Sequence, residues 1–186
     1  MIQREWFDQP DKERHNEPHN ERGEDQSGEQ SGERSGERGK ERNGETRGEP
    51  GLRFQCTMCG NCCTGPTGYV KFTEDEAVAI AQRLGVSIES FYERHARKTA
   101  VGWSLVEVKT QFGYDCVFLD RETVSGKAVC SLYDDRPEQC RTWPFWKSNL
   151  TSERAWKAAS RGCPGIGSGP TYSPQYIRLS RDRIDV

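Results

Sequence analysis

The stretch that decides the fold is a run of closely spaced cysteines, Phe54-Gln-Cys56-Thr-Met-Cys59-Gly-Asn-Cys62-Cys63. Its two-residue gaps let a turn bring Cys56, Cys59 and Cys62 to a common point, and Gly60 permits a tight reversal of the backbone there. Thiolate metal sites use this spacing because a small metal centre needs several sulfur atoms from a short stretch of chain. Adjacent side chains diverge, so we expect Cys62 and Cys63 to be divided between two sites, or between a cluster and its edge.

Four further cysteines follow this run, at Cys116, Cys130, Cys140 and Cys163. Eight thiols match the stoichiometry of two four-thiolate sites, whereas a single tetrahedral zinc ion cannot use all of them. Alternatively, the close cysteines of the first run and the remote Cys163-Pro164 match the way in which bacterial ferredoxins hold a four-iron cluster. The sequence leaves both arrangements open and predicts zinc or iron, an iron–sulfur cluster included, as the bound metal.

A disulfide framework is the other use for eight cysteines, and the start of the chain argues against it. The first ten residues, MIQREWFDQP, are charged and lack the apolar segment of a secretory signal. Thiols in the cytoplasm are normally kept reduced. We therefore expect a cytoplasmic protein whose cysteines serve a metal.

Composition excludes several classes of protein. The 186 residues include 27 Lys and Arg against 29 Asp and Glu, which gives a formal net charge of −2. That balance argues against a strongly basic nucleic-acid-binding protein, and the closely spaced histidine pair of DNA-reading zinc fingers is lacking. No run approaches the ~18 apolar residues of a membrane-spanning helix, so no membrane partner is expected.

The character of the chain changes sharply near residue 50. Residues 1–50 hold only four apolar side chains (Met1, Ile2, Trp6 and Phe7), and SGEQSGERSGER repeats a Ser-Gly-Glu unit within them. Such a segment buries too little apolar surface to offset its conformational entropy. We predict a disordered, charged, low-complexity tail over 1–50, either a solubilising extension or an arm for a protein partner. A cysteine-cluster metal-binding domain is predicted over 51–186.

Helix signals are clearest after residue 72. Thr73 and Glu76 match a capping box, apolar residues then recur at helical spacing, and Gly85 supplies a left-handed stop. Ser87 begins a second predicted helix with His95 on its apolar stripe. We expect this histidine to be a packed core residue rather than a metal ligand.

Strand and loop signals fill the rest of the domain. Residues 101–108 and 114–119 are predicted as strands, and 124–127 as a hairpin turn that leads into a short strand. Asp135 is expected to cap a short helix carrying Cys140.

The dense Gly and Pro after residue 162 predict mostly loop in the last part of the chain. Together these patterns predict a small, loop-rich α+β domain with few short helices and strands, stabilised by metal.

Two groups of side chains near the later cysteines suit a metal site. Basic residues there could offset surplus thiolate charge, and aromatic residues could shield the site from water. The alternative for each is ordinary surface or core packing. The residues are Arg136, Arg141 and Arg161, and Trp143, Phe145 and Trp146.

Three more segments extend the pattern begun by CxxCxxCC. They read Cys116-Val-Phe-Leu-Asp120, Cys130-Ser-Leu-Tyr-Asp-Asp-Arg-Pro-Glu-Gln-Cys140-Arg-Thr-Trp-Pro-Phe145 and Cys163-Pro-Gly165. With them, residues 52–180 resemble the YkgJ-type cysteine-cluster proteins, a family described as a zinc- or iron-chelating domain. The resemblance implies metal chelation and maps all eight cysteines onto the family's eight. The domain also resembles the cysteine-rich part of flagellin lysine methylases, which implies that an iron–sulfur cluster can form.

The function expected from these features is metal binding by the thiolates of Cys56, Cys59, Cys62, Cys63, Cys116, Cys130, Cys140 and Cys163. The alternative is an iron–sulfur redox enzyme or an accessory component of a protein-modifying methylase. No catalytic motif supports the alternative, because a nucleotide-binding Gly-rich loop, a G-x-S-x-G elbow and HExxH are all missing. Gly165-Ile-Gly167-Ser-Gly169 follows no predicted strand, and Asp134-Asp135 better suits a helix cap.

Overall fold

The computed structural model describes residues 5–8 and 50–184. Its α-helices and 3-10 turns are η1 (Trp6–Asp8), η3 (Asn61–Cys63), α1 (Glu74–Leu84), α2 (Ile88–His95), η4 (Tyr133–Asp135), α3 (Glu138–Arg141), α4 (Lys147–Leu150), α5 (Glu153–Gly162) and α6 (Pro174–Asp182). Its strands are β1 (Leu52–Phe54), β2 (Ala96–Thr99), β3 (Gly102–Leu105), β4 (Glu107–Thr110), β5 (Gly113–Cys116), β6 (Leu119–Asp120), β7 (Val129–Cys130) and β8 (Ile166–Tyr172). The strands pair two by two, all antiparallel, as β1–β8, β2–β3, β4–β5 and β6–β7. The predicted small α+β fold with short elements is confirmed.

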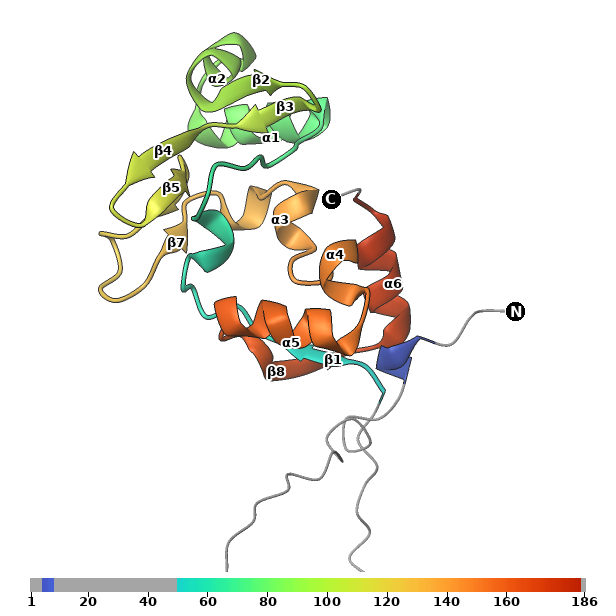
Figure 1. Cartoon of the computed structure of the whole chain (residues 1–186). Coiled ribbons are helices and arrows are strands. Elements are labelled where there is room, and N and C mark those ends of the chain that lie inside the picture. The colour runs from blue at the N-terminus through green and yellow to red at the C-terminus, as the bar shows by residue number, and fades with distance from the viewer. Residues whose placement is uncertain (1–4, 9–49, 185–186) are drawn as a thin grey trace, which may run out of the picture.

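Figure 1 shows two lobes joined at their middle, with α1, α2, β2 and β3 at the top and α4–α6, β1 and β8 below. Each lobe has its own apolar core. The upper core consists of Ala77, Ile80, Ala81, Phe91, Ala96, Leu105, Phe118 and Leu132. The lower core consists of Phe7, Leu52, Phe145, Leu150, Trp156 and Ile177. No helix among the described residues is long and apolar enough to cross a membrane.

The helices of the upper lobe form as their local sequence predicts. The Thr73 hydroxyl accepts the Glu76 amide at 3.2 Å while the Glu76 carboxylate accepts the Thr73 amide at 2.8 Å, which completes the capping box. Gly85 ends α1 in the left-handed conformation, with φ 66°. The Ser87 side chain caps α2, which ends at His95. All of these predictions are confirmed.

The strands divide differently from the prediction. The expected strand over 101–108 is two strands, β3 and β4, separated by Val106, whose amide donates to the His95 carbonyl at 2.9 Å. The Val106 carbonyl accepts the Val117 amide, and Val106 thereby connects the β2–β3 hairpin to the β4–β5 hairpin. The predicted turn at 124–127 is present, closed by the Lys127 amide on the Val124 carbonyl at 3.0 Å.

The prediction of mostly loop after residue 162 is wrong. The glycine-rich segment is strand β8, which pairs with β1, and α6 follows it with Ser173 as its N-cap. A Cβ at Gly165, just before β8, would lie 2.1 Å from the carbonyl oxygen of Gln55, just after β1, so the absence of a side chain lets these two segments approach. The cap predicted at Asp135 is also wrong. Asp135 lies within η4, and α3 begins after Pro137 without a side-chain cap.

The beginning of the chain also differs from the expected tail. Glu5–Asp8 pack on the lower lobe, and Phe7 is 0% exposed there. The physical reason is that Trp6 and Phe7 are two of the few apolar side chains of this segment. Residues 9–49 lie outside the described residues, and the division of the chain at residue 50 stays a prediction.

Candidate metal centre

All eight cysteines line one cavity of about 70 Å³ between the two lobes. A single water molecule needs about 10–15 Å³ of such space, so the cavity has room for several atoms of a bound group. The thiols come from six places in the fold. Cys56 and Cys59 follow β1, Cys62 and Cys63 lie in η3, Cys116 ends β5, Cys130 ends β7, Cys140 lies in α3, and Cys163 follows α5. All eight are free of disulfide bonds.

The turn that presents the first four thiols depends on Gly60. This residue adopts a left-handed conformation with φ 76°, and its carbonyl accepts the Cys63 amide at 2.9 Å. The Ala128 amide bonds to the Met58 carbonyl at 2.8 Å and thereby joins the turn to the strand that carries Cys130. On the other side, the side-chain amide Nδ2 of Asn61 donates to the Gly162 carbonyl at 2.9 Å, next to Cys163. The turn is thus fixed to both neighbouring thiol-bearing segments.

Cys62 and Cys63 do not diverge as expected. Their sulfur atoms lie 3.5 Å apart, close enough to share a proton. The hydrogen bond from Cys63 and, to a smaller extent, the charge of Arg136 lower the pKa of Cys62 to about 7, against the opposing effect of burial. The same contact raises the pKa of Cys63. One thiolate therefore forms near neutral pH, and its neighbour keeps the proton.

The other central thiols resist ionisation. Burial raises the pKa of Cys116 to about 11, with a smaller contribution from the neighbouring Cys130. Burial also raises the pKa of Cys130 and of Cys140, and the surrounding thiols add to the effect. Several thiolates cannot coexist in this cavity unless a cation offsets their charge. The donor set therefore fits a thiophilic metal.

The thiols face one space without forming a ready-made cage. Among the described residues, no three Cys, His, Asp or Glu side chains are grouped closely enough to hold a metal ion. The structure accordingly does not divide the eight cysteines into ligand sets. The Thr57 hydroxyl, also on the cavity wall, is buried without a hydrogen-bond partner in the described part of the chain.

Three of the six side chains expected to surround the metal line the cavity. Arg136 does so with its guanidinium 4.0 Å from the Tyr133 ring centroid. The Trp143 indole donates to the Cys163 sulfur at 3.5 Å, and Trp146 packs against Trp143 edge to face, with ring centroids 4.8 Å apart.

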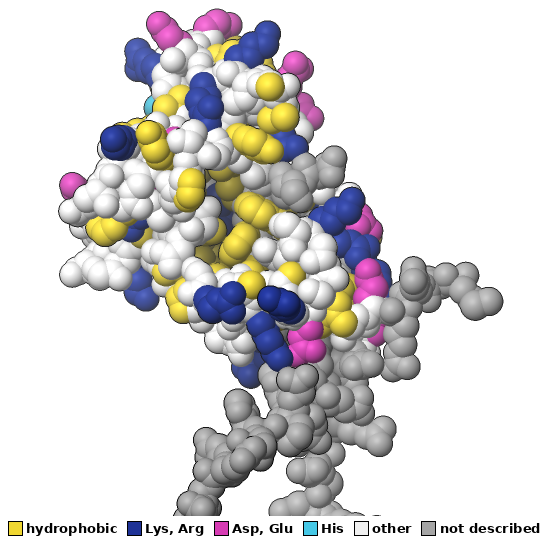
Figure 2. Space-filling view, viewed as in Figure 1, with side chains coloured by type: hydrophobic (Ala, Val, Ile, Leu, Met, Phe, Trp, Pro, Cys, Tyr) yellow, Lys and Arg dark blue, Asp and Glu magenta, His cyan; other side chains and the backbone are white. Residues whose placement is uncertain are grey.

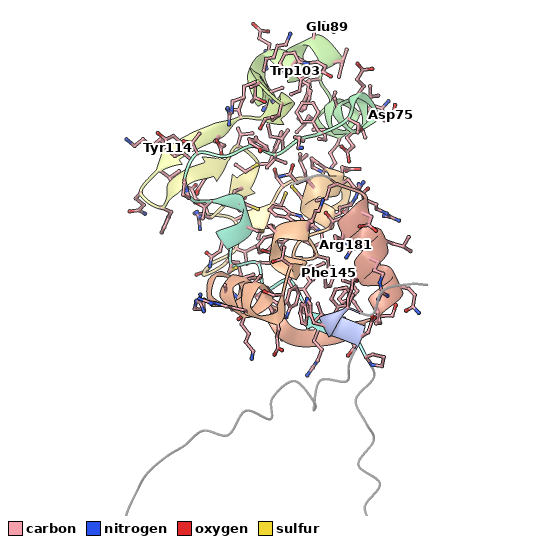
Figure 3. All side chains as sticks on the ribbon, turned by 45° about the vertical axis from the view of Figure 1, so that its right-hand side comes forward. Asp75, Glu89, Trp103, Tyr114, Phe145 and Arg181 are labelled. Atoms are coloured by element: carbon pink, nitrogen blue, oxygen red, sulfur yellow. The ribbon has the colours of Figure 1, made fainter. Side chains whose placement is uncertain are left out.

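The other three do not line the cavity. Arg141 pairs with Glu138 at 2.9 Å, and Arg161 is exposed and does not line the cavity. Phe145, labelled in Figure 3, belongs to the lower core and stacks on Trp156 with ring centroids 5.9 Å apart. His95 packs between Phe91 and Phe118, as expected of a core histidine.

Two polar networks around the cavity were not predicted from the sequence. Gln139, buried beside Cys140, accepts the Lys71 amide at 2.8 Å and donates to the Tyr69 carbonyl at 3.0 Å. Asp115, buried beside Cys116, is held by two hydrogen bonds from Arg121 and one from the Thr64 hydroxyl. Each network joins segments far apart in the chain, so no local pattern could have indicated it.

A second, open hollow adjoins the thiol cavity. This groove of about 470 Å³ shares Cys56, Cys62, Cys140 and Arg136 with the cavity. Aromatic rings form much of its wall, namely Phe54, Tyr133, Trp143, Phe145, Tyr172 and Tyr176. Figure 2 shows hydrophobic side chains gathered in a hollow at the middle of the molecule, between the lobes.

Comparison with known proteins gives one family and no structural relative. No solved structure matches the chain. A family model described as a zinc- or iron-chelating domain matches residues 55–164, which is more than half of the chain and includes all eight cysteines. The match runs from the residue before Cys56 to the residue after Cys163. The chain belongs to the CxxCxxCC family, whose domain is described as zinc- or iron-chelating.

Proposed function

We propose that this protein binds zinc or iron through the eight cysteine thiolates that line the cavity, in one or two centres. The observation that carries the proposal is that all eight cysteines, from six places in the fold, line one partly open cavity. Free thiols in this number suit a reducing compartment such as the cytoplasm.

Residues next to the thiols have defined roles in this proposal. The Arg136 guanidinium supplies positive charge beside Cys62, Cys130 and Cys140 and partly offsets an excess of thiolate charge. The Trp143 indole orients the Cys163 sulfur by its hydrogen bond, and Trp146 helps to exclude water from the cavity. A bound metal would supply the cation that lets several buried thiols ionise together.

The metal decides what the centre does. Four-thiolate zinc sites have no open position for a reacting water, so zinc would be structural, and chelation would unfold the domain. An iron–sulfur cluster would instead make the anaerobically purified protein brown, with visible charge-transfer absorption.

The experiment is elemental analysis with an absorption spectrum on the full chain, purified without oxygen. Cys59→Ser and Cys63→Ser are compared with Ser125→Ala, an exposed residue of the 124–127 turn. We expect both cysteine variants to lose metal while the control keeps it. Loss of different amounts or different spectral bands indicates two centres, and identical loss indicates one shared cluster. Wild-type protein without zinc or iron contradicts the proposal.

The groove favours a second candidate, an iron–sulfur redox enzyme or accessory component of a protein-modifying methylase. A ligand of ordinary size fits about 300–1,000 Å³, and here a groove of 470 Å³ reaches three of the thiols. Anaerobic redox titration and titration with S-adenosylmethionine test this candidate. A reversible potential or saturable binding supports it, and the absence of both leaves metal binding alone.

A further inference from the structure

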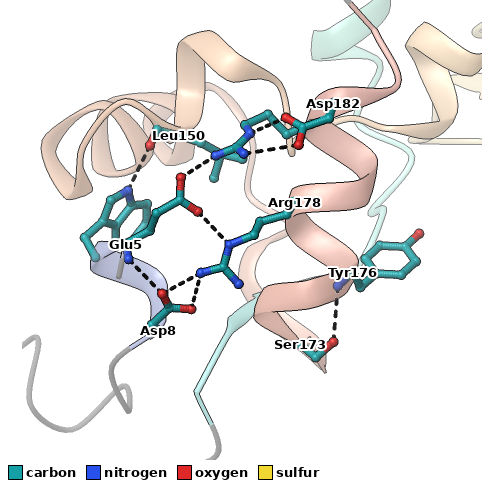
Figure 4. A network of polar contacts seen from close by, with 9 residues as sticks. Glu5, Asp8, Leu150, Ser173, Tyr176, Arg178 and Asp182 are labelled. Atoms are coloured by element: carbon teal, nitrogen blue, oxygen red, sulfur yellow. Dashed lines mark hydrogen bonds and ion pairs between the residues drawn. The ribbon is translucent and has the colours of Figure 1, made fainter. Parts of the chain in front are cut away.

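A four-residue segment at the start of the chain packs on α4, α5 and α6 of the lower lobe. We call Glu5–Asp8 the hook and its binding surface on α4, α5 and α6 the hook groove. Phe7 is fully buried in the lower core, and the Trp6 indole donates to the Leu150 carbonyl at 2.9 Å (Figure 4). Trp6 also lies against Trp156, with ring centroids 6.4 Å apart.

The acidic residues that flank these aromatic rings in the hook pair with arginines of α6. Arg178 of α6 pairs with Glu5 at 3.0 Å and donates to Asp8 at 2.6 Å, so one guanidinium holds both acids of the hook. Arg181, one turn later on α6, also pairs with Glu5. The Arg178 guanidinium lies 5.4 Å from the centre of the Phe7 ring. The hook groove therefore recognises the pattern acid–aromatic–aromatic–acid.

The connection between the hook and the rest of the domain is long. Residues 9–49 are 41 residues, and a chain of that length spans up to ~140 Å when extended. A domain of the size of residues 50–184 has a radius of gyration of only about 14 Å. Covalent geometry therefore allows the hook to reach the hook groove of another molecule as well as its own.

We propose that the hook groove is an exchangeable docking site, and that a second copy of this chain can insert its Glu5–Asp8 segment there. Each copy carries one hook and one groove, so two copies satisfy each other reciprocally in a closed dimer. Docking within one chain competes, because the linker makes that event intramolecular. The dimer fraction consequently rises with protein concentration.

The test uses two full-length variants that are complementary. Trp6→Ala/Phe7→Ala, called the hook variant, removes the hook and leaves the hook groove intact. Arg178→Glu/Arg181→Glu, called the groove variant, removes the hook groove and leaves the hook intact. Light scattering after size exclusion should show a monomer for each variant alone and a heterodimer for their equimolar mixture. A third chain that carries all four changes should not associate with the hook variant. Circular dichroism and metal content establish that each variant is folded.

A peptide measurement separates docking from folding defects. We expect a labelled peptide of residues 1–10 to bind the hook variant and to bind at least ~10-fold more weakly when Arg178→Glu/Arg181→Glu is added. Arg154→Glu/Arg161→Glu, a matched change at two exposed arginines of α5, should leave peptide binding unchanged. A peptide with Glu5→Arg and Asp8→Arg should regain affinity for the Arg178→Glu/Arg181→Glu groove.

Two results would overturn the proposal. If the peptide binds but the complementary variants stay monomeric up to millimolar concentration, the hook serves only its own chain. If the peptide does not bind the folded hook variant, the hook groove is not a docking site.

Discussion

Arg121→Ala should destabilise the domain because it leaves a buried carboxylate without its cation. The Asp115 side chain is only 6% exposed and faces Arg121, which is 24% exposed, at 2.9 and 3.2 Å. Removing one partner of a buried pair costs about 3–5 kcal/mol. Since water reaches the guanidinium side of the pair, we expect about 3 kcal/mol. Loss of the contact between Arg121 and the Phe112 ring, at 4.3 Å, is included in that figure.

Urea unfolding of the full chain at pH 7, with equal metal content, measures this cost. Arg83→Ala is the matched control, because Arg83 pairs with Asp135 at 3.3 Å but the two side chains are 43% and 33% exposed. We expect a cost below ~1 kcal/mol for the control. The double variant with Asp115→Asn should cost clearly less than the sum of the single variants. Equal costs for Arg121→Ala and the control would refute the reasoning.

The same pair predicts a pH dependence. The hydrogen bonds from Arg121, and then that from Thr64, lower the pKa of Asp115 in the folded state. Its contribution to stability is thus complete above the unfolded value of about 3.9 and is lost as the pH falls through the folded pKa. The difference between wild type and Arg121→Ala should therefore narrow below about pH 4. A difference that stays constant down to pH 2 would contradict the assignment.

Three further predictions concern single side chains. Gly60→Ala should reduce the amount of bound metal, as measured by elemental analysis. The new Cβ would lie 2.6 Å from the Ala128 Cβ, in addition to the strain of a left-handed backbone. Gly126→Ala is the control, because Gly126 also has a left-handed backbone, with φ 71°, but open space around it. Ile80→Ala should cost about 2–5 kcal/mol in urea unfolding, since Ile80 is fully buried. Burial lowers the pKa of His95 in the folded state. As the pH drops below about 6.5, the unfolded chain therefore binds a proton at His95 more readily than the folded chain does, and the free energy of unfolding should fall. His95→Phe should flatten that fall in thermal melts between pH 8 and pH 5, and an unchanged pH profile would exclude His95 as its source.

What the sequence predicts well is local. The capping box at Thr73, the left-handed stop at Gly85 and the cap at Ser87 each involve residues within one turn of helix, so their partners are visible in the sequence. The sequence also led us to expect the cysteines to come together, because their spacing and count are typical of a metal site, and all eight line one cavity.

What the sequence does not predict depends on distant partners. Residues 166–172 contain the Gly and Pro typical of loops, and they form a strand because β1, more than a hundred residues earlier, pairs with them. Phe7 lies in a segment that is mostly charged, and the average composition of this segment does not indicate that its Phe7 ring is buried in the lower core. The pairing of Asp115 with Arg121 and Thr64 likewise needs the β4–β5 hairpin to meet the cysteine turn.

The position of the cavity explains why a metal would matter to this fold. Cys116 and Cys130 pack against the upper core, whereas Cys163 follows α5 of the lower lobe, and Cys56 follows β1, whose Leu52 belongs to the lower core. Neither core is large, and small cores rarely supply more than about 3–5 kcal/mol. A metal held by thiolates from both sides would therefore join two marginal units into one cooperative unit. On this argument, chelation should unfold both lobes together, so a lobe that keeps its structure after metal removal would show that the cavity does not couple them.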